Sequence, residues 1–388
     1  MHACMLAYTF YESDNRVRRY AETLARRGDK VDVIALRGNA GPKIEIINNV
    51  RLFKIQKRVK NETSRFSYLF RLFQFFLRSM FFLAIQEIKE HYDLVHVHSV
   101  PDFEVFAAWF PKVRGAKLIL DIHDLVPELY ASKFDARPDA GLNRPLLLVE
   151  RMSAQFADHV IAANHIWRDR LLTRSVKPAK CTAILNYPDG SIFYRRGRTR
   201  TDEKFIMLYP GSLNRHQGMD LAIRALARIT DQAPQVELHI YGEGTEAGNL
   251  RKLAVELGLA QRVRFNNGVR ITEVPHIMEN ADLGIVPKRT DGFGNEAFST
   301  KVLEFMALGV PVVVSDSAID QYYFTDRVVT FFKGNDEEQL AKCMLEMIHD
   351  TAKRKAQAER ADEFVKTFDW DLRKDEYLGL VDILVPSS

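Results

Sequence analysis

The chain has 388 residues, a length typical of two domains rather than one. Hydrophobic residues make up 46% and charged residues 27%, a globular composition that argues against disorder. The net charge of +4 hides an uneven distribution: residues 1–200 hold 33 Lys/Arg and 21 Asp/Glu (+12), and the totals of 55 and 51 leave −8 for residues 201–388. A basic half suits an anionic membrane, a phosphorylated acceptor or nucleic acid. No nucleic-acid recognition motif accompanies the charge, so nucleic acid is not expected as a partner.

Cysteine content and apolar runs bear on the compartment. Cys4, Cys181 and Cys343 are far apart and form no CxxC, which argues against a disulfide framework or structural zinc and indicates a reducing cytoplasm. The apolar first ten residues follow no basic segment, so they predict a buried strand rather than a signal peptide. Two arginines interrupt the apolar stretch 66–85, so a membrane-spanning helix is not expected.

Apolar runs alternate with amphipathic helical patterns along most of the chain, which predicts an α/β protein with parallel sheets. The predicted strands are 2–8, 31–36, 94–98, 117–122, 159–162, 181–185, 205–209, 236–241, 262–265, 283–286 and 311–314. The predicted helices are about 15–27, 66–90, 142–156, 218–229, 246–258, 299–308 and 336–349. The polar, turn-rich stretch 187–204 is interpreted as a linker. We therefore expect two doubly wound Rossmann-like domains facing a cleft, with ligands at the carboxyl ends of the strands.

The segment after the predicted strand 205–209 has the features of an anion site. A turn containing Gly211 leads to a helix that starts after Gly218, so free backbone amides and the positive end of the helix dipole would face a ligand. Arg215 and His216 could add charge. An ordinary βα loop is the alternative, and the pattern is neither a dinucleotide fingerprint nor a P-loop.

A second set of polar residues surrounds the predicted helix 299–308. Glu296 and Glu304 are eight residues apart, and Ser299 between them is a plausible N-cap. The amides of this helix start would hold a diphosphate, Glu304 would accept from ribose hydroxyls, and Glu296 would accept from sugar hydroxyls. A solvated helix face is the alternative, but the Gly-rich approach and the following strand favour a site.

Taken together, these segments resemble the family-4 retaining glycosyltransferases of the GT-B fold. The resemblance is carried by GxL…HQG at 211–218, IYGEG at 240–244, VRFNNGV at 263–269, ADLGIVP at 281–287, LEFMALGVPVV at 303–313, YDLVHVHSVPD at 92–102, LDIHDLVPELY at 120–130, FADHVIAANH at 156–165 and ILNYPD at 184–189. It implies an acceptor-binding domain at 1–190 and a nucleotide-sugar-binding domain at 200–368. It also implies that a final helix, about 370–388, packs back on the first domain.

The resemblance also implies residue roles. It assigns donor binding to Gly211, Ser212, Arg215, His216, Gln217, Gly242, Val269, Ser299, Thr300, Lys301 and Glu304, and catalytic positions to His123, Asp124 and Glu296. His123 would line the donor pocket beside the reacting carbon, and Val269 would lie on the loop that touches the base. No cofactor and no essential metal are expected.

The sequence departs from the family in its phosphate loop. Ser212 and Gln217 stand where the family commonly has Arg and Lys, so the charge on the leaving diphosphate must be met by Arg215, His216 or Lys301. The loop after the first strand, YTFYESDNR, also lacks the usual Gly-Gly pair. The general base is left open, with His123, Asp124 and Glu128 as candidates.

The segment 51–82 combines basic and aromatic residues. It carries eight Lys/Arg against the single acid Glu62, and residues 66–82 include eight aromatics. Phe66, Leu69, Phe70, Phe73, Leu77 and Met80 share one helical face. This face predicts either packing on the first sheet or an interfacial membrane helix, and the two are compatible if only the first turns contact lipid.

Two short motifs resemble metal sites. His96 and His98 form HxH at a strand end, which we interpret as cleft-lining or core histidines rather than a metal pair. Asp369 and Asp371 flank Trp370, and helix capping is preferred over metal binding there.

The sequence thus predicts a cytoplasmic retaining glycosyltransferase, with peripheral contact at the inner membrane face. It would transfer a sugar from a nucleoside diphosphate sugar to a hydroxyl of a glycan or lipid-linked acceptor in polysaccharide or glycolipid biosynthesis. A nucleoside-diphosphate-sugar epimerase of the same fold and a catalytically inactive GT-B scaffold are the alternatives.

Overall fold

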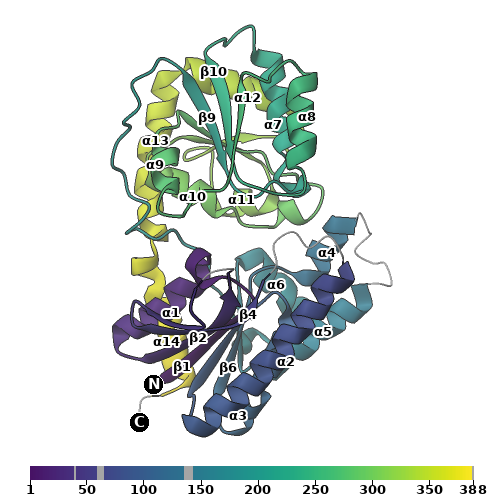
Figure 1. The fold of residues 1–388 in the computed structure, drawn as a ribbon. Coiled ribbons are helices and arrows are strands. Elements are labelled where there is room, and N and C mark those ends of the chain that lie inside the picture. The colour runs from purple at the N-terminus through teal and green to yellow at the C-terminus, as the bar shows by residue number, and fades with distance from the viewer. Residues whose placement is uncertain (39–40, 59–64, 135–142, 387–388) are drawn as a thin grey trace. The chain divides into compact units, whose positions relative to one another are not determined.

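The computed structural model describes residues 1–38, 41–58, 65–134 and 143–386. The chain forms two compact units, the first made of Met1–Asn186 with Lys374–Ser388 and the second of Tyr187–Arg373. Each unit has its own sheet with helices on both faces (Figure 1). The stretch 187–204, which was expected to be a linker, belongs to the second unit and contains no helix or strand.

The sheet of the first unit has the order β3-β4-β2-β1-β5-β6-β7-β8. Its strands are β1 (His2–Ala7), β2 (Lys30–Arg37), β3 (Ile44–Ile47), β4 (Val50–Lys57), β5 (Leu94–His98), β6 (Lys117–Ile122), β7 (His159–Ala162) and β8 (Cys181–Ala183). All neighbours pair in parallel except β3 with β4. The central strands are buried along their whole length, as expected for a parallel sheet covered on both faces.

Helices lie between most of these strands along the chain. They are α1 (Asn15–Arg27), α2 (Arg65–Lys89), α3 (Trp109–Val113), α4 (Val126–Phe134), α5 (Asn143–Phe156) and α6 (His165–Arg174), with α14 (Trp370–Leu384) added from the end of the chain. A 3-10 segment, η2 (Asp102–Ala108), lies between β5 and α3.

The second unit has a six-stranded parallel sheet of order β11-β10-β9-β12-β13-β14. Its strands are β9 (Phe205–Pro210), β10 (Val236–Tyr241), β11 (Val263–Asn266), β12 (Leu283–Val286), β13 (Val312–Ser315) and β14 (Thr330–Phe332). Its helices are α7 (Met219–Ile229), α8 (Ala247–Glu256), α9 (Val274–Glu279), α10 (Thr300–Ala307), α11 (Ala318–Tyr323), α12 (Glu337–His349) and α13 (Thr351–Val365). Two apolar clusters, one on each side of this sheet, form its core.

The predicted fold class of two Rossmann-like α/β domains is confirmed, and the predicted strands and helices are present with ends shifted by a few residues. Three strands, β3, β4 and β14, were not predicted. Arg51 and Lys54 break the apolar pattern of β4, because each is held in a tertiary ion pair, Arg51 with Asp32 and Lys54 with Glu12 and Glu45. In the edge strand β3, Glu45 faces Lys54, and the exposed side carries Ile44 and Ile46.

Helix α2 turns a different face inward from the one that sequence spacing indicated. Leu72, Phe75 and Leu83 are buried, whereas Leu69 is 59% and Phe73 53% exposed. The helix is apolar around its whole circumference, so periodicity alone could not select the packing face. The predicted packing of the Leu69–Phe73 face on the sheet is therefore wrong, while Lys60 and Glu62 and the side chains of Arg65 and Phe66 lie outside the described residues.

The final helix packs on the first unit. The Tyr377 hydroxyl lies 3.1 Å from His96 Nδ1, and Arg27 Nη1 donates to Asp382 Oδ1 at 2.6 Å. At the start of this helix Asp369 Oδ1 accepts from the Asp371 amide at 2.6 Å, which confirms the capping interpretation of this pair.

Candidate functional site

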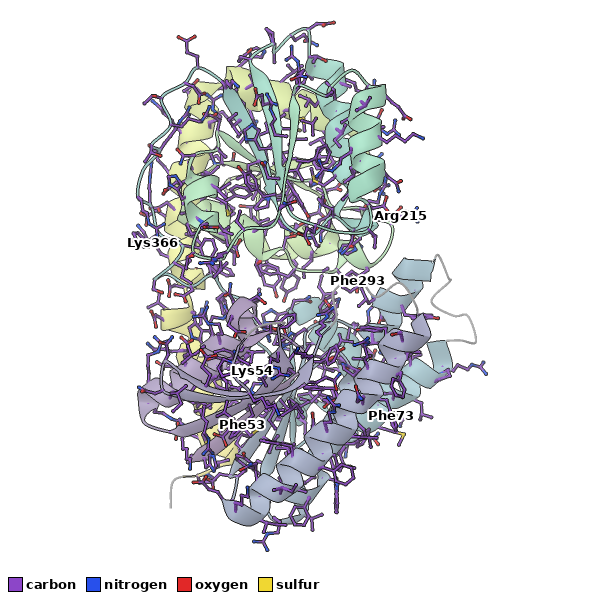
Figure 2. All side chains as sticks on the ribbon, viewed as in Figure 1. Phe53, Lys54, Phe73, Arg215, Phe293 and Lys366 are labelled. Atoms are coloured by element: carbon purple, nitrogen blue, oxygen red, sulfur yellow. The ribbon has the colours of Figure 1, made fainter. Side chains whose placement is uncertain are left out.

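Three loops of the second unit leave the same edge of its sheet. They follow β9, β10 and β12, which are neighbours in a parallel sheet and so end together. Arg215 from the first loop and Phe293 from the third are labelled in Figure 2. Most of the predicted donor-binding residues come from these loops and from the start of α10.

The first two loops touch backbone to backbone. The Gly211 amide donates to Tyr241 O at 2.8 Å, and the Leu213 amide donates to Glu243 O at 2.9 Å. Gly242 has φ 151°, and a Cβ there would lie 1.9 Å from Gly211 O. Only glycine fits this crossing, so the structure gives a physical reason for the Gly turn at 242.

The first loop ends at Gly218, the residue before α7. Its φ of 66° is left-handed, and a Cβ would lie 1.9 Å from Pro287 O in the loop after β12. Within the described chain no side chain caps α7. The helix start therefore keeps amides directed at the site edge, as an anion site requires.

A buried tyrosine joins the first loop to α10. The Tyr209 hydroxyl lies 2.8 Å from Gln217 Oε1 and 2.9 Å from Ser212 O. Lys301 Nζ donates to Gln217 Oε1 at 3.3 Å and lies 5.0 Å from the centre of the Tyr209 ring. The structure thus brings Ser212, Gln217 and Lys301 together around one side chain.

Lys301 provides a cation at the loop where the family's usual Arg and Lys are missing. Burial lowers the pKa of Lys301 to about 8, although nearby Glu304 opposes this effect. The Lys301 amine lies close enough to Gly211 that a Cβ there would approach Nζ to 3.3 Å. Lys301 is thus the expected cation whose charged group contacts the Gly211–Gly218 loop, through Gln217.

The other two cations lie differently. His216 Nε2 is 3.0 Å from Gln217 Nε2, and its ring packs edge-on against Phe293 at 5.4 Å. Arg215 is exposed and lines a groove bordered by Arg224 of α7 and Glu246 at the start of α8.

The loop that carries Glu296 is fixed from below by a buried ion pair. Lys288 Nζ lies 2.8 Å from Asp320 Oδ2 and donates to Ala297 O at 2.8 Å. Lys288 is 1% and Asp320 0% exposed, and Ser317 Oγ donates to Asp320 Oδ2 at 2.6 Å. The residue next to Glu296 is therefore tied to α11 through a lysine held within the core.

Helix α10 begins after Ser299, as predicted, with Ser299 in the extended N-cap conformation. In the described chain its hydroxyl makes no capping bond to the helix. Thr300, Lys301 and Glu304 occupy the first turns and are half-buried. Val269, in the loop after β11, is 37% exposed.

In the first unit the predicted His123 follows β6 and belongs to a polar network centred on Asp121. Its Nε2 lies 3.1 Å from Asp121 Oδ2 and 3.2 Å from His98 Nδ1. Arg16 binds both oxygens of Asp121, with Nε at 2.7 Å and Nη2 at 2.8 Å. This bidentate pair holds the pKa of Asp121 well below its usual range, against the opposing effect of burial.

The two histidines of the HxH motif belong to the same network. His96 and His98 are buried and stack at 4.2 Å, and desolvation lowers the pKa of each. Asp121 lies close enough to complete a three-ligand cluster with them. Because Arg16 binds both carboxylate oxygens of Asp121, the donor set fits an Arg–Asp–His network better than a metal ion. The part of the interpretation that places both histidines in the core is confirmed.

The candidates for general base differ in their surroundings. Glu128 of α4 accepts from Arg174 at 2.6 and 3.0 Å and from Arg170 at 3.2 Å. These arginines keep the pKa of Glu128 below its ordinary value, although burial acts the other way. A carboxylate held in this way is a weak base. The other two candidates, His123 and Asp124, are half-buried at the end of β6.

Sequence reasoning missed the residues that support the site. Asp121 and Arg16 are separated by 105 positions, and no local spacing links them. Neither Lys288 nor Asp320 was among the candidate site residues, and the two are 32 positions apart. The sequence offered one signal for these ion pairs, a charged residue within or just after an apolar strand. Such a charge is buried on folding and therefore needs a partner of opposite charge.

Comparison with known proteins relates both units to glycosyltransferases. The family model described as Glycosyltransferase Family 4 matches residues 14–189, and the model described as Glycosyl transferases group 1 matches residues 192–364. A relative from Corynebacterium glutamicum, named a GDP-mannose-dependent monoacylated alpha-(1-6)-phosphatidylinositol monomannoside mannosyltransferase, is 26% identical over 197 residues, or 50% of this chain and 51% of that protein. The chain spans about half the length of the first curated relatives it matches.

Solved structures share the fold along the whole chain. Sucrose-phosphate synthase from Thermosynechococcus elongatus has a TM-score of 0.82 at 20% identity, covering 100% of both chains. Anabaena HepE, solved in complex with UDP-glucose, has a TM-score of 0.73 at 16% identity, covering 98% of this chain and 99% of that chain. At these identities the likeness establishes the GT-B arrangement of two Rossmann-like domains and nothing about substrates.

Proposed function

The chain belongs to the family-4 glycosyltransferases, and from this premise we propose that it transfers a sugar from a nucleoside diphosphate sugar to a hydroxyl group. The observation that carries the proposal is the start of α10, where Lys301 contacts the Gly211–Gly218 loop through Gln217. A cation, an uncapped helix start and a glycine-shaped loop then converge where a diphosphate would lie.

The proposed roles follow from these positions. The leaving diphosphate gains negative charge as its bond to the anomeric carbon breaks, and Lys301 with the amides at the start of α10 stabilises that charge. Glu304, in the second turn of α10, accepts from the ribose hydroxyls, and Glu296 accepts from sugar hydroxyls. The Lys288–Asp320 pair keeps the Glu296 loop in place.

We propose that the reaction retains the anomeric configuration. The acceptor oxygen forms the new bond to the anomeric carbon, and its proton passes to an oxygen of the departing diphosphate. His123 is assigned as a catalytic residue of the first unit, with its ring oriented by Asp121. Glu128 is not assigned the role of general base, because two arginines hold its carboxylate.

The acceptor is proposed to be a glycan or a lipid-linked molecule of polysaccharide or glycolipid assembly, handled on the cytoplasmic side of a membrane. Support comes from the excess of +12 in residues 1–200, which suits phosphorylated acceptors. The C. glutamicum relative is named for a phosphatidylinositol mannoside acceptor, a lipid of this kind.

A thermal-shift series tests the donor half of the proposal. Uridine, guanosine, adenosine and thymidine diphosphates and their sugars are each added to the full chain, and at least one set should raise Tm. Transfer of the sugar from that donor to an added acceptor, followed by NMR of the new anomeric proton, then tests retention.

Two results would overturn the proposal. Interconversion of a free sugar nucleotide without an acceptor would instead support an epimerase of the same fold. A chain that binds no nucleoside diphosphate would support an inactive scaffold.

A further inference from the structure

The outer side of α2 is an apolar surface on a unit whose core is already complete. Leu69, Phe70, Phe73, Phe81, Ile85 and Ile88 are between 53% and 75% exposed. We name these six residues the α2 outer face. Figure 2 labels Phe73 on this helix. At about 100° per residue they fall on one side, opposite the buried Leu72, Phe75 and Leu83. A continuous exposed apolar face of this length usually marks a contact surface.

The α2 outer face is long. Helix α2 has 25 residues, which corresponds to roughly 37 Å at 1.5 Å per residue. Helix α3 packs against α2 and carries two exposed apolar residues of its own, Trp109 at 46% and Val113 at 76%.

The charge around this face is of one sign. Along α2, Arg78 lies about two turns and Lys89 five turns after Arg71. The three side chains therefore point within about 20° of one another and line a single edge of the outer face. The acid Glu87 of α2 points inward, is 2% exposed, and accepts from the Tyr92 amide at 3.0 Å. An apolar face bordered by cations and lacking an exposed acid along residues 67–89 is complementary to an anionic, apolar partner.

Helix α2 by itself is long and apolar enough to cross a membrane, since an 18-residue window within residues 67–89 has a mean hydropathy of 1.4. Its inner face, however, is bound to the unit. The Phe82 ring packs on Phe53 of β4 at 4.9 Å, the Phe76 ring packs on Phe103 of η2 at 5.7 Å, and Gln56 Nε2 donates to Arg71 O at 3.0 Å. A helix held along its length by its own domain can lie on a bilayer without crossing it.

We propose that the α2 outer face docks the protein on an anionic lipid bilayer, with α2 parallel to the membrane plane. The apolar side chains enter the acyl boundary, and Arg71, Arg78 and Lys89 reach the lipid phosphates. A second copy of the chain fits less well, because two-fold pairing of this face would bring the cationic edge of each copy near that of the other. This inference deepens the proposed function by naming where a lipid-linked acceptor would be met.

Flotation of the full chain with vesicles tests the docking surface. Wild-type protein should float with vesicles of phosphatidylcholine and phosphatidylglycerol at low salt, and less with phosphatidylcholine alone or at high salt. The double variant Phe73→Gln/Phe81→Gln should lose at least about ten-fold in vesicle affinity. The double variant Arg78→Gln/Lys89→Gln should lose roughly five-fold per cation on anionic vesicles only.

The matched control changes two exposed apolar residues of the second unit. Val255→Gln/Tyr322→Gln replaces side chains that are 65% and 55% exposed, and it should float like wild type. All four altered apolar positions are exposed, so each variant should keep the Tm of wild type.

Three results would overturn the proposal. They are a wild-type chain that does not float with anionic vesicles, a Phe73/Phe81 variant that floats as well as wild type, or a wild-type dimer that this variant splits while vesicles remain unbound. The last would make the face an interface between copies. Donor binding is measured on the same variants by thermal shift without vesicles, so a failure of docking and a failure of the proposed function are distinguishable.

Discussion

The two units begin with the same strand–loop–helix arrangement but treat the helix start differently. In the first unit Asp14 caps α1 and accepts from the amides of Arg16 and Val17, both at 3.1 Å. In the second unit Gly218 precedes α7 and, within the described residues, no side chain caps that helix. The first unit closes the start of its first helix with its own carboxylate, and we propose that the second unit leaves the start of its first helix for an external anion.

Cations near these helix starts follow the same division. Arg16, in the first turn of α1, donates from Nε and Nη2 to the two oxygens of Asp121 and is 4% exposed. Lys301, in the first turn of α10, meets the neutral amide of Gln217. Arg16 is thus neutralised by a carboxylate of its own unit, and we propose that the charge of Lys301 serves a ligand.

The largest expected effect comes from breaking the internal pair of the first unit. Asp121→Asn leaves the buried Arg16 guanidinium without its counter-charge, which should cost about 3–5 kcal/mol of stability. Thermal and denaturant unfolding of the first unit measure the loss. Because two units can unfold separately, the earlier transition is the one to follow.

The control removes a carboxylate from an exposed pair. Glu363→Gln breaks the contact of Glu363 with Lys366, where the side chains are 74% and 59% exposed. It should change stability by less than about 1 kcal/mol. An Asp121→Asn variant as stable as this control would show that the Asp121 network is not structural.

The next effect concerns the ligand cation of the second unit. Lys301→Met should lower kcat by about one hundred- to one thousand-fold, since it removes one charge from the proposed diphosphate site. The fold should be retained, because the change removes a desolvated charge. Steady-state kinetics with the donor identified by thermal shift, beside the Tm of the variant, check both statements.

The pH dependence of donor binding sharpens this prediction. Burial lowers the pKa of Lys301 to about 8, so the amine is charged below that pH and neutral above it. The KM for the donor should therefore rise as pH passes about 8. Lys301→Arg, which stays charged, should remove this rise, and a wild-type KM that is flat from pH 7 to about 9.5 would contradict the assignment.

The third prediction concerns Glu104, a buried carboxylate of the first unit that has no cationic partner among the described residues. Burial raises the pKa of Glu104 in η2 from 4.5 to about 8, while Ser79 slightly opposes the shift. Between these values the folded state holds a proton that the unfolded chain has released, so the contribution of Glu104 to stability is greatest below pH 4.5 and falls as pH rises toward 8. Glu104→Gln should gain about 1–3 kcal/mol at pH 8 and flatten that slope.

Unfolding followed from pH 5 to about 8.5 measures the slope. The pH dependence that remains in Glu104→Gln should combine a fall from Asp102, whose pKa burial raises to about 7, with a rise from His96 and His98, whose pKa burial lowers. An unchanged slope would mean that Glu104 is ionised in the folded state.

The sequence predicted the fold well because buried parallel strands are nearly continuous apolar runs, as in β5, β9 and β13. It predicted which loops carry the site because glycines fall where backbones meet, as at Gly242. Strands β3 and β4 were missed because charged residues held in tertiary ion pairs, such as Arg51 with Asp32 and Lys54 with Glu12, interrupt the apolar pattern.

Partners distant in sequence could not be predicted. The contact of Arg16 with Asp121 and the contact of Lys288 with Asp320 depend on tertiary packing. The face of α2 that packs inward was also undetermined, since every side of that helix is apolar. Such choices are made by the surrounding strands and not by the helix itself.

The smallest effect converts the second unit's open helix start into the closed kind found in the first. Ser299→Asp places a carboxylate at the N-cap of α10, as Asp14 does for α1. The cap should stabilise the protein by about 1 kcal/mol, because it accepts from free amides and complements the dipole. The same charge should weaken nucleoside diphosphate binding by at least about ten-fold, because it repels the ligand from those amides. The control Ser299→Asn caps the helix without adding charge, so it should give most of the gain in stability with a smaller loss of diphosphate affinity. If Ser299→Asp bound the diphosphate as tightly as wild type, the start of α10 would not be the phosphate site.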